Sequence, residues 1–107
     1  MVEHLADELD RTYGALAHPV RRTMLELLRA DDLRVTELSA PFEMSLAAAS
    51  KHVVSLERAG LLTRTVHGRD HILSLRAAEL EPAATWFEPY RSFWETRLDA
   101  LTRHLGG

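Results

Sequence analysis

The sequence predicts one mainly α-helical domain with a small β-hairpin beyond its middle. Apolar residues recur at helical spacing over most of the chain, and the pattern changes to alternation on both sides of Gly68. No internal repeat, low-complexity tract or linker interrupts the 107 residues. A chain of this length has room for a single hydrophobic core, so we expect residues 1–107 to form one domain.

The first two helices are predicted on either side of the pair His18-Pro19. The first covers roughly residues 4–16, where Leu5, Leu9, Tyr13 and Leu16 recur at helical spacing. Pro19 suits the first position of the second helix, because the N–H that proline lacks is not needed there. The second helix is expected to end near Asp31, and its apolar face consists of Val20, Met24, Leu27 and Leu28.

A short helix, a turn and a longer helix are predicted next. "LRV" is a short extended piece, and Thr36 begins a helix that runs to about Phe42. A tight turn, "EMS", leads to Ser45, which is a natural N-cap. The helix that follows is expected to end at Ala59-Gly60, with glycine as the C-terminal stop.

A hairpin and a long final helix complete the predicted order. The stretch "LLTRTVHGRDHILSL" alternates apolar and polar side chains, which indicates two strands joined at "HGRD". The tail from Ala77 to Leu105 is helical, with Pro82 in its first turn, and Pro89 is expected to kink or split it. This is the order of a winged helix-turn-helix domain with additional N- and C-terminal helices. The helix-turn-helix covers about 36–59, the wing about 61–75 and the last helix about 79–105.

The helix that begins after Ser45 has two different faces. Its inner stripe is predicted on Leu46, Ala49, Val53 and Leu56. Lys51, the only lysine beside twelve arginines, points almost directly opposite, among alanine and serine side chains. Small side chains let a helix approach base edges in the major groove, and lysine can reach guanine acceptors or phosphate. The alternative is an ordinary amphipathic helix with a solvated outer face.

Charge is distributed unevenly along the chain. The net charge of −3 divides into −4 on residues 1–43, +3 on residues 44–76 and −2 on residues 77–107. A basic middle between acidic ends favours one face that meets an anion, although chance is the alternative.

Three segments resemble a known family: "ALAHPVRRTMLELL", "VTELSAPFEMSLAAASKHVVSLERAGLLTRTVHGRDHILSL" and "WFEPYRSFWETRLDALTRHL". Together they are similar to the ArsR-type winged-helix transcriptional regulators over nearly the whole chain, with "SKHVVSLERAGL" as the most specific part. The similarity is to a metal-independent branch that lacks the cysteine motif. The resemblance implies a homodimer that binds a palindromic double-stranded DNA operator and represses its own operon.

The resemblance also implies which residues face DNA. The recognition-helix positions are Ser45, Ala47, Ala48, Ser50, Lys51 and His52, joined on the same face by Ser55, and the wing positions are Arg64, His67 and Arg69. Arg21 or Arg22 matches a family arginine, with an intramolecular salt bridge as an equal alternative. Relatives often have proline where this chain has Ala47, which loosens the helix start slightly.

An aromatic stripe in the last helix indicates a dimer interface. A chain of this size has little core to cover so many rings, so an interface shared by the first and last helices accounts for them better than core packing alone. Its predicted residues are Leu5, Leu9, Trp86, Tyr90, Phe93, Trp94, Leu98 and Leu101. A pocket at that interface for an unidentified small molecule is also possible.

Metal sensing is disfavoured by the residue content. Without cysteine the chain can form no disulfide and no thiolate metal site. Asp99 and His104 are five residues apart and share a helix face poorly. We therefore predict no metal and no cofactor, and keep a sensor with histidine and carboxylate ligands, including His4, as an alternative.

Other function classes are excluded on similar grounds. Ser50, His52 and Asp70 are the residue types of a catalytic triad, but Ser50 and His52 point to different sides of one helix, so no enzyme is predicted. No apolar run reaches the roughly 18 residues that span a membrane, and a cytoplasmic location is expected. A winged-helix module that binds only protein remains an alternative, and weak salt dependence of any DNA binding would favour it.

Overall fold

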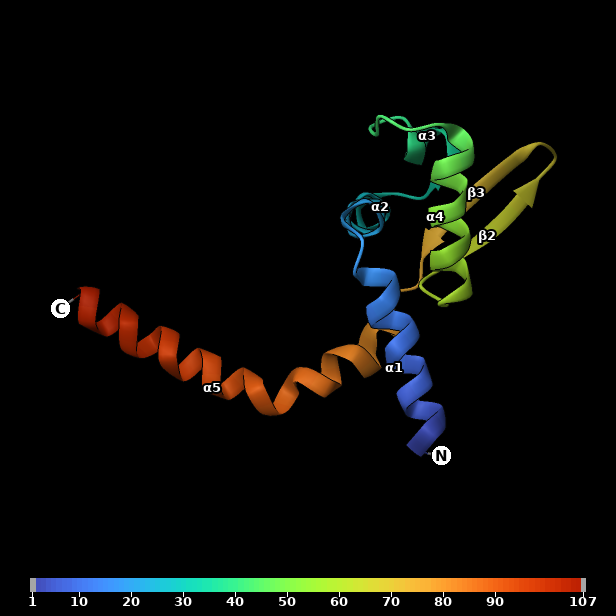
Figure 1. Cartoon of the computed structure of the whole chain (residues 1–107). Helices are drawn as coiled ribbons and strands as arrows, with labels where there is room; N and C mark the ends of the chain where they lie inside the picture. Colours follow the sequence, from blue (N-terminus) through green and yellow to red (C-terminus); the bar gives the residue numbers. More distant parts are fainter. Residues whose placement is uncertain (1, 107) are drawn as a thin grey trace.

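Within residues 2–106 the chain forms five α-helices, a three-stranded antiparallel sheet and one 3-10 turn (Figure 1). The structure is a computed structural model that describes the backbone of these residues and the side chains of residues 7–105. The helices are α1 (Val2–Leu16), α2 (Pro19–Ala30), α3 (Val35–Ser39), α4 (Leu46–Arg58) and α5 (Glu81–Gly106). The strands are β1 (Leu33–Arg34), β2 (Leu62–His67) and β3 (Asp70–Leu75), and η1 (Ala77–Leu80) is the 3-10 turn. The mainly helical winged helix-turn-helix fold with extra terminal helices is confirmed.

The sheet joins two distant segments of the chain. β2 and β3 make the predicted hairpin, antiparallel from Leu62 opposite Leu75 to His67 opposite Asp70. β1 adds to the other edge of β3, with Leu33 opposite Leu73, so the strand order is β1-β3-β2. The sequence indicates an extended piece at β1 but not its pairing, because two residues carry no alternation that would identify a partner.

The helix-turn-helix differs from its prediction in the length of α3 and of the turn. The sequence predicts a helix that runs to Phe42, but α3 ends at Ser39. Pro41 explains the early end, because it has no N–H with which to extend the helical hydrogen-bond ladder. The turn therefore occupies all the residues between Ser39 and Ser45 rather than only "EMS". The N–H of Phe42 donates to the Ser39 carbonyl at 3.1 Å within it.

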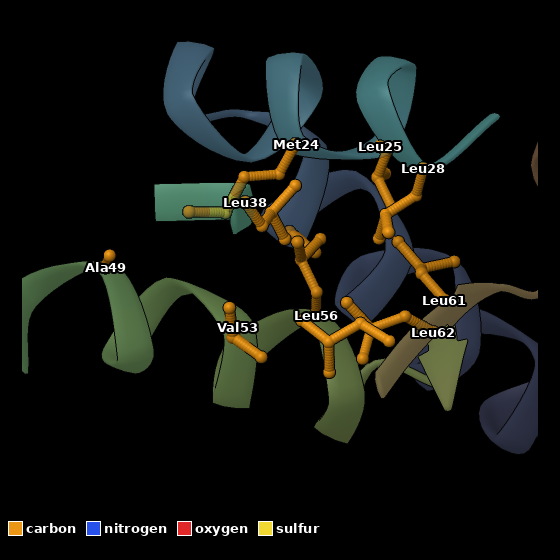
Figure 2. Packing of buried hydrophobic residues seen from close by; sticks show 11 residues of the cluster. Met24, Leu25, Leu28, Leu38, Ala49, Val53, Leu56, Leu61 and Leu62 are labelled. Atoms are coloured by element: carbon orange, nitrogen blue, oxygen red, sulfur yellow. The ribbon is translucent and has the colours of Figure 1, made fainter. Parts of the chain in front are cut away.

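The core lies between α2, α3, α4 and the start of the hairpin. Figure 2 shows Met24, Leu25 and Leu28 on α2 above the labelled side chains of α4. The members that are at most 2% exposed are Met24, Leu38, Ala49, Val53, Leu56, Leu61, Leu62 and Leu73. Burial of each leucine-sized side chain stabilises the fold by about 1.5–3 kcal/mol. The cluster therefore fixes α4 firmly against α2 and leaves the opposite face of α4 outside the core.

α5 lies mostly outside this core. Ala83, 5% exposed, is the one described residue of α5 that is buried. The helix bends and runs away from the body in Figure 1, and Pro89, inside it, deprives the Thr85 carbonyl of an N–H partner. Of the two outcomes expected at Pro89, the structure shows a kink and not a split. The radius of gyration is 17.4 Å, against about 13 Å for a compact domain of this size, so the single chain is an extended molecule.

Candidate nucleic-acid interface

Both ends of α4 are fixed by local hydrogen bonds. The Ser45 side chain accepts the N–H of Ala48 at 3.1 Å, which confirms the predicted N-cap. At the other end Gly60 has φ 78°, and its N–H donates to the Glu57 carbonyl at 3.0 Å. The N–H of Leu61 donates to the Leu56 carbonyl at 3.0 Å, which completes a Schellman motif. Both ends of the helix are therefore set by local hydrogen bonds that the sequence itself supplies.

The two faces of α4 follow the predicted division except at its first residue. Ala49, Val53 and Leu56 are buried, whereas Ala47 and Lys51 are exposed. Leu46, expected on the inner stripe, is 52% exposed, and that prediction is wrong. Leu46 is the first residue of α4, directly after its N-cap Ser45, and the buried stripe begins only at Ala49.

His52 lies on the flank of α4 that faces α2. Its Nδ1 accepts a hydrogen bond from Nε of Arg21 at 3.1 Å, and its ring centroid is 5.6 Å from that of His18. Desolvation by burial lowers the pKa of His52, and the nearby Arg21 and His18 lower it further. The neutral imidazole is therefore favoured, and it lies between Arg21 on α2 and His18, the residue before that helix.

Arg64, a predicted wing contact, is engaged within the protein. Its Nε and Nη2 donate to the two carboxylate oxygens of Glu57, each at 3.3 Å. Its Nη1 lies 3.2 Å from Nδ1 of His71 on the neighbouring strand. The guanidinium therefore joins α4 to the hairpin within the protein.

The hairpin tip presents the other two wing residues to solvent. His67 and Arg69 are exposed on either side of Gly68, whose φ is 62°. Glycine at the first central position with positive φ is the arrangement of a type II′ turn, which follows strand twist. Asp70 pairs with Arg34 across the sheet, with Nη2 and Oδ2 3.5 Å apart. Arg69 therefore stands at the tip beside a carboxylate that is already paired.

The ten predicted DNA contacts fall into three groups. Fully exposed are Ser45, Ala47, Lys51, His67 and Arg69. Half-buried on the sides of α4 are Ala48, Ser50, His52 and Ser55, while Arg64 is half-buried at the α4–hairpin junction. Sequence reasoning missed the roles of His18, Glu57 and His71, because each acts through a partner more than three positions away on another element.

Arg21 and Arg22, of which one was expected either to match a family arginine or to form a salt bridge, make different contacts in the structure. Arg21 bonds to His52 on the recognition helix, whereas Nη1 of Arg22 donates to the Leu16 carbonyl at 2.7 Å. Among the residues whose side chains the structure describes, neither arginine forms the salt bridge with a carboxylate that the sequence left open.

The predicted dimer residues of α5 form an exposed apolar stripe. Their side chains are between 48% and 60% exposed: Trp86, Tyr90, Phe93, Trp94, Leu98 and Leu101. Phe87, at 40%, and Leu105, at 76%, extend the stripe and were missed by the prediction. Leu9 on α1 is half-buried beside Trp86, and the side chain of Leu5 lies outside the described residues.

The start of α5 is joined to α1 through Tyr13. The hydroxyl of Tyr13 donates to the Ala83 carbonyl at 2.8 Å, and its ring meets Phe87 edge to face at 5.7 Å between centroids. Two open grooves of about 410 and 460 Å³ share Leu9 and Trp86 in their walls. The α1–α5 junction thus presents apolar surface continuous with the stripe.

The described residues provide neither a metal site nor a membrane-spanning helix. Among the described residues, no three histidine, aspartate or glutamate side chains lie close enough together to hold a metal ion. No described helix is long and apolar enough to cross a bilayer.

Comparison with known proteins adds independent information. A family model described as a helix-turn-helix domain matches residues 16–65. Among curated proteins, the transcriptional repressor SdpR of Bacillus subtilis is 24% identical over 78 residues, covering 73% of this chain and 87% of SdpR.

Solved structures agree with this match. An ArsR family transcriptional regulator has a TM-score of 0.77 and 29% identity, covering 84% of this chain and 93% of its own. A possible transcriptional regulator for arsenical resistance is 33% identical with a TM-score of 0.66, covering 85% of this chain and 92% of its own. A homodimeric winged helix-turn-helix DNA-binding domain from Mycobacterium bovis has a TM-score of 0.66 at 23% identity, with coverages of 92% and 88%, and shows the shared fold alone.

Proposed function

Because this chain belongs to the ArsR family of transcriptional regulators, a family of DNA-binding proteins and not of enzymes, we propose that it is a homodimeric repressor. It binds an inverted-repeat operator without a metal ion and regulates its own operon. The likeness to a curated repressor supports the direction of regulation.

The exposed face of α4 is the observation that carries this proposal. A helix enters the major groove only where its side chains are short enough for the backbone to approach the bases. On α4 the exposed outer side near its start carries Ala47 and Lys51, while the opposite side is buried in the core. The long cation therefore projects beyond its neighbours toward base acceptors or phosphates.

The hairpin supports the same proposal from a second element. β2 follows α4 after three residues and lies beside it in Figure 1. The Arg64–Glu57 ion pair joins the two elements. Arg69 and His67 at the tip then meet the DNA backbone or minor groove beside the site that α4 reads. Basic residues on two rigidly joined elements give one interface from a chain whose net charge is −3.

The homodimer is supported by the apolar face of α5. Eight of the ten large apolar side chains that are exposed in the described residues lie on this helix. Contiguous apolar surface of this kind marks an interaction site in a soluble protein. A second copy that covers it also relates two α4 helices by two-fold symmetry, which an inverted-repeat operator requires.

Metal independence is supported by the donor set. The chain has no cysteine, and Asp99 and His104 on α5 have no third ligand among the described residues. A Zn²⁺ titration followed by calorimetry tests this part, and tight binding that releases DNA would contradict it.

DNA selection followed by a salt titration tests the DNA-binding proposal. Duplexes recovered by the protein from a random-sequence pool should share one inverted repeat. Affinity for that repeat should fall steeply with salt, because each neutralised phosphate contributes about −0.9 to the slope of log K against log salt. No enriched sequence, together with a flat salt response, would instead favour a module that binds protein.

A further inference from the structure

The hydrogen bond between Arg21 and His52 fixes the chemical state of a side chain on the recognition helix. Nδ1 of His52 lies 3.1 Å from Nε of Arg21. A guanidinium only donates hydrogen bonds, so Nδ1 must accept and carries no proton. The ring is therefore neutral, and its single N–H is at Nε2.

The Nε2–H of His52 is open to solvent. Among the described residues it has no hydrogen-bond partner in the protein, since the bond to Arg21 uses the other ring nitrogen. No buried side-chain nitrogen or oxygen in this part of the chain lacks a partner. Because Nε2 has no partner and is not buried, it is accessible to solvent. It belongs to the helix whose outer face carries Lys51, the preceding residue in the chain.

Arg21 on α2 and His18, the N-cap residue before that helix, oppose a charged His52. The guanidinium of Arg21 is in contact with the ring, and the His18 ring lies 5.6 Å away between centroids. Together with partial burial they lower the pKa of His52. A protonated imidazole would also lose the bond to Arg21, because Nδ1 could no longer accept it.

We propose that Arg21 is a positioning residue that keeps His52 uncharged and directs its Nε2–H to an acceptor on a base edge of the operator. The inference rests on the proposed DNA-binding function and adds the class of group that His52 reads. Purine N7, guanine O6 and thymine O4 are the acceptors that the major groove offers. A phosphate would favour the protonated ring, which Arg21 and His18 oppose.

The first test needs no DNA and uses the free protein. Imidazole ¹⁵N shifts of His52 are followed through a pH titration in the wild type, in Arg21→Ala and in Arg22→Ala. Arg22 is the matched control, because it removes the same charge one residue away and bonds to the Leu16 carbonyl instead. The inference expects an unprotonated Nδ1 in the wild type and a pKa of His52 that rises in Arg21→Ala only. A protonated Nδ1, or equal titration in all three proteins, would overturn it.

The second test compares His52→Ala with His52→Gln on a duplex that the wild type selects from a random pool. The alanine variant should lose roughly 5- to 150-fold in specific affinity, the range for one base contact. Its salt slope should match the wild type, because no charge is lost. Glutamine, which keeps an N–H donor near the same place, should restore most of the affinity.

Two DNA results would contradict base reading by His52. A slope reduced by about 0.9 per protomer in His52→Ala would show a charged phosphate contact, and unchanged affinity would show no contact. If the wild type selects no duplex, the proposed function fails and base reading fails with it. The NMR titration still decides separately whether Arg21 holds His52 neutral.

Discussion

Lys51 is the only lysine of the chain, and its place on α4 separates it from every other cation of that helix. Arg58, the other exposed cation on this face, is seven residues and about two turns further along. Near Lys51 the outer face offers only the short side chains of Ala47, Ala48 and Ser55. In this part of α4, Lys51 is thus the long side chain that extends beyond the helix surface.

Replacement of Lys51 by alanine should weaken specific DNA binding by about 1–3 kcal/mol if the ammonium contacts a base, with relaxed preference at one position. If it contacts phosphate, all sequences should weaken alike and the salt slope should fall by about 0.9 per protomer. Fluorescence anisotropy on the selected duplex and on a scrambled one separates these cases. Arg58→Ala, a matched loss of charge at the far end of α4, should change binding much less. Equal effects of both variants would show that the wrong part of the helix has been assigned.

The state of His52 should also make folding stability depend on pH. Its pKa in the folded protein is lowered from 6.5, so the unfolded chain binds the proton more readily. The stability linked to this group is fully present above pH 6.5 and is lost as the pH falls through the lowered pKa. Thermal unfolding of the wild type and of His52→Gln between pH 5 and 8 should show a smaller loss in the variant on acidification. Parallel curves would contradict the neutral assignment.

At the scale of elements, the sequence predicts every helix and the hairpin, because each carries its own periodicity and end signals. Ser45 and Gly60 mark the ends of α4 by local chemistry that the structure confirms. Contacts between elements were harder to predict from the sequence. The pairing of β1 with β3 and the Arg64–Glu57 and Arg21–His52 bonds depend on positions 7 to 40 residues apart, which no local pattern records.

Leu46 shows the same limit on a single helix. Its spacing places it with Ala49 and Val53, but its burial depends on which elements pack against the first residue of α4, and spacing does not record that. Pro41 is a local signal for the early end of α3, but no local signal predicts the exposure of Leu46.

Gly68 at the wing tip allows a test of turn geometry. Gly14 is its control, because replacement of that glycine should change the free energy of unfolding in the opposite direction. Gly68→Ala places a side chain at φ 62°, which costs roughly 1–2 kcal/mol, although open space surrounds the position. Gly14→Ala lies within α1, also in open space and at an ordinary helical φ, and should stabilise by about 0.5–1 kcal/mol. Urea unfolding measures both. Equal shifts for the two variants would show that the backbone at Gly68 is not constrained by the turn.

At the scale of the whole molecule, the single chain is extended and leaves an apolar face of α5 exposed. Its radius of gyration exceeds that of a compact domain, and α5 exposes its aromatic stripe away from the core. The sequence predicts the stripe but cannot separate an interface from core packing, because both need apolar residues at helical spacing. The structure distinguishes an interface from core packing, because the stripe is exposed in the single chain. The prediction that a second copy of the chain covers this stripe stays a prediction.

A charge placed in the stripe should separate the two copies. Phe93→Glu, at a side chain 54% exposed in the single chain, should give monomers in sedimentation equilibrium, because a carboxylate would be buried in the interface. Ser92→Glu adds the same charge on the opposite side of α5 and should leave the dimer intact. A dimer that survives Phe93→Glu would place the interface elsewhere.

The central claim is that two copies of α4 read one inverted repeat, and a hydroxyl-radical footprint on the selected duplex tests it most directly. The account predicts two protected patches related by two-fold symmetry, with centres about 34–36 Å or one helical turn apart. The patches should weaken together in Phe93→Glu, because loss of the dimer removes both. A single asymmetric patch in the wild type, unaffected by loss of the dimer, would contradict the account.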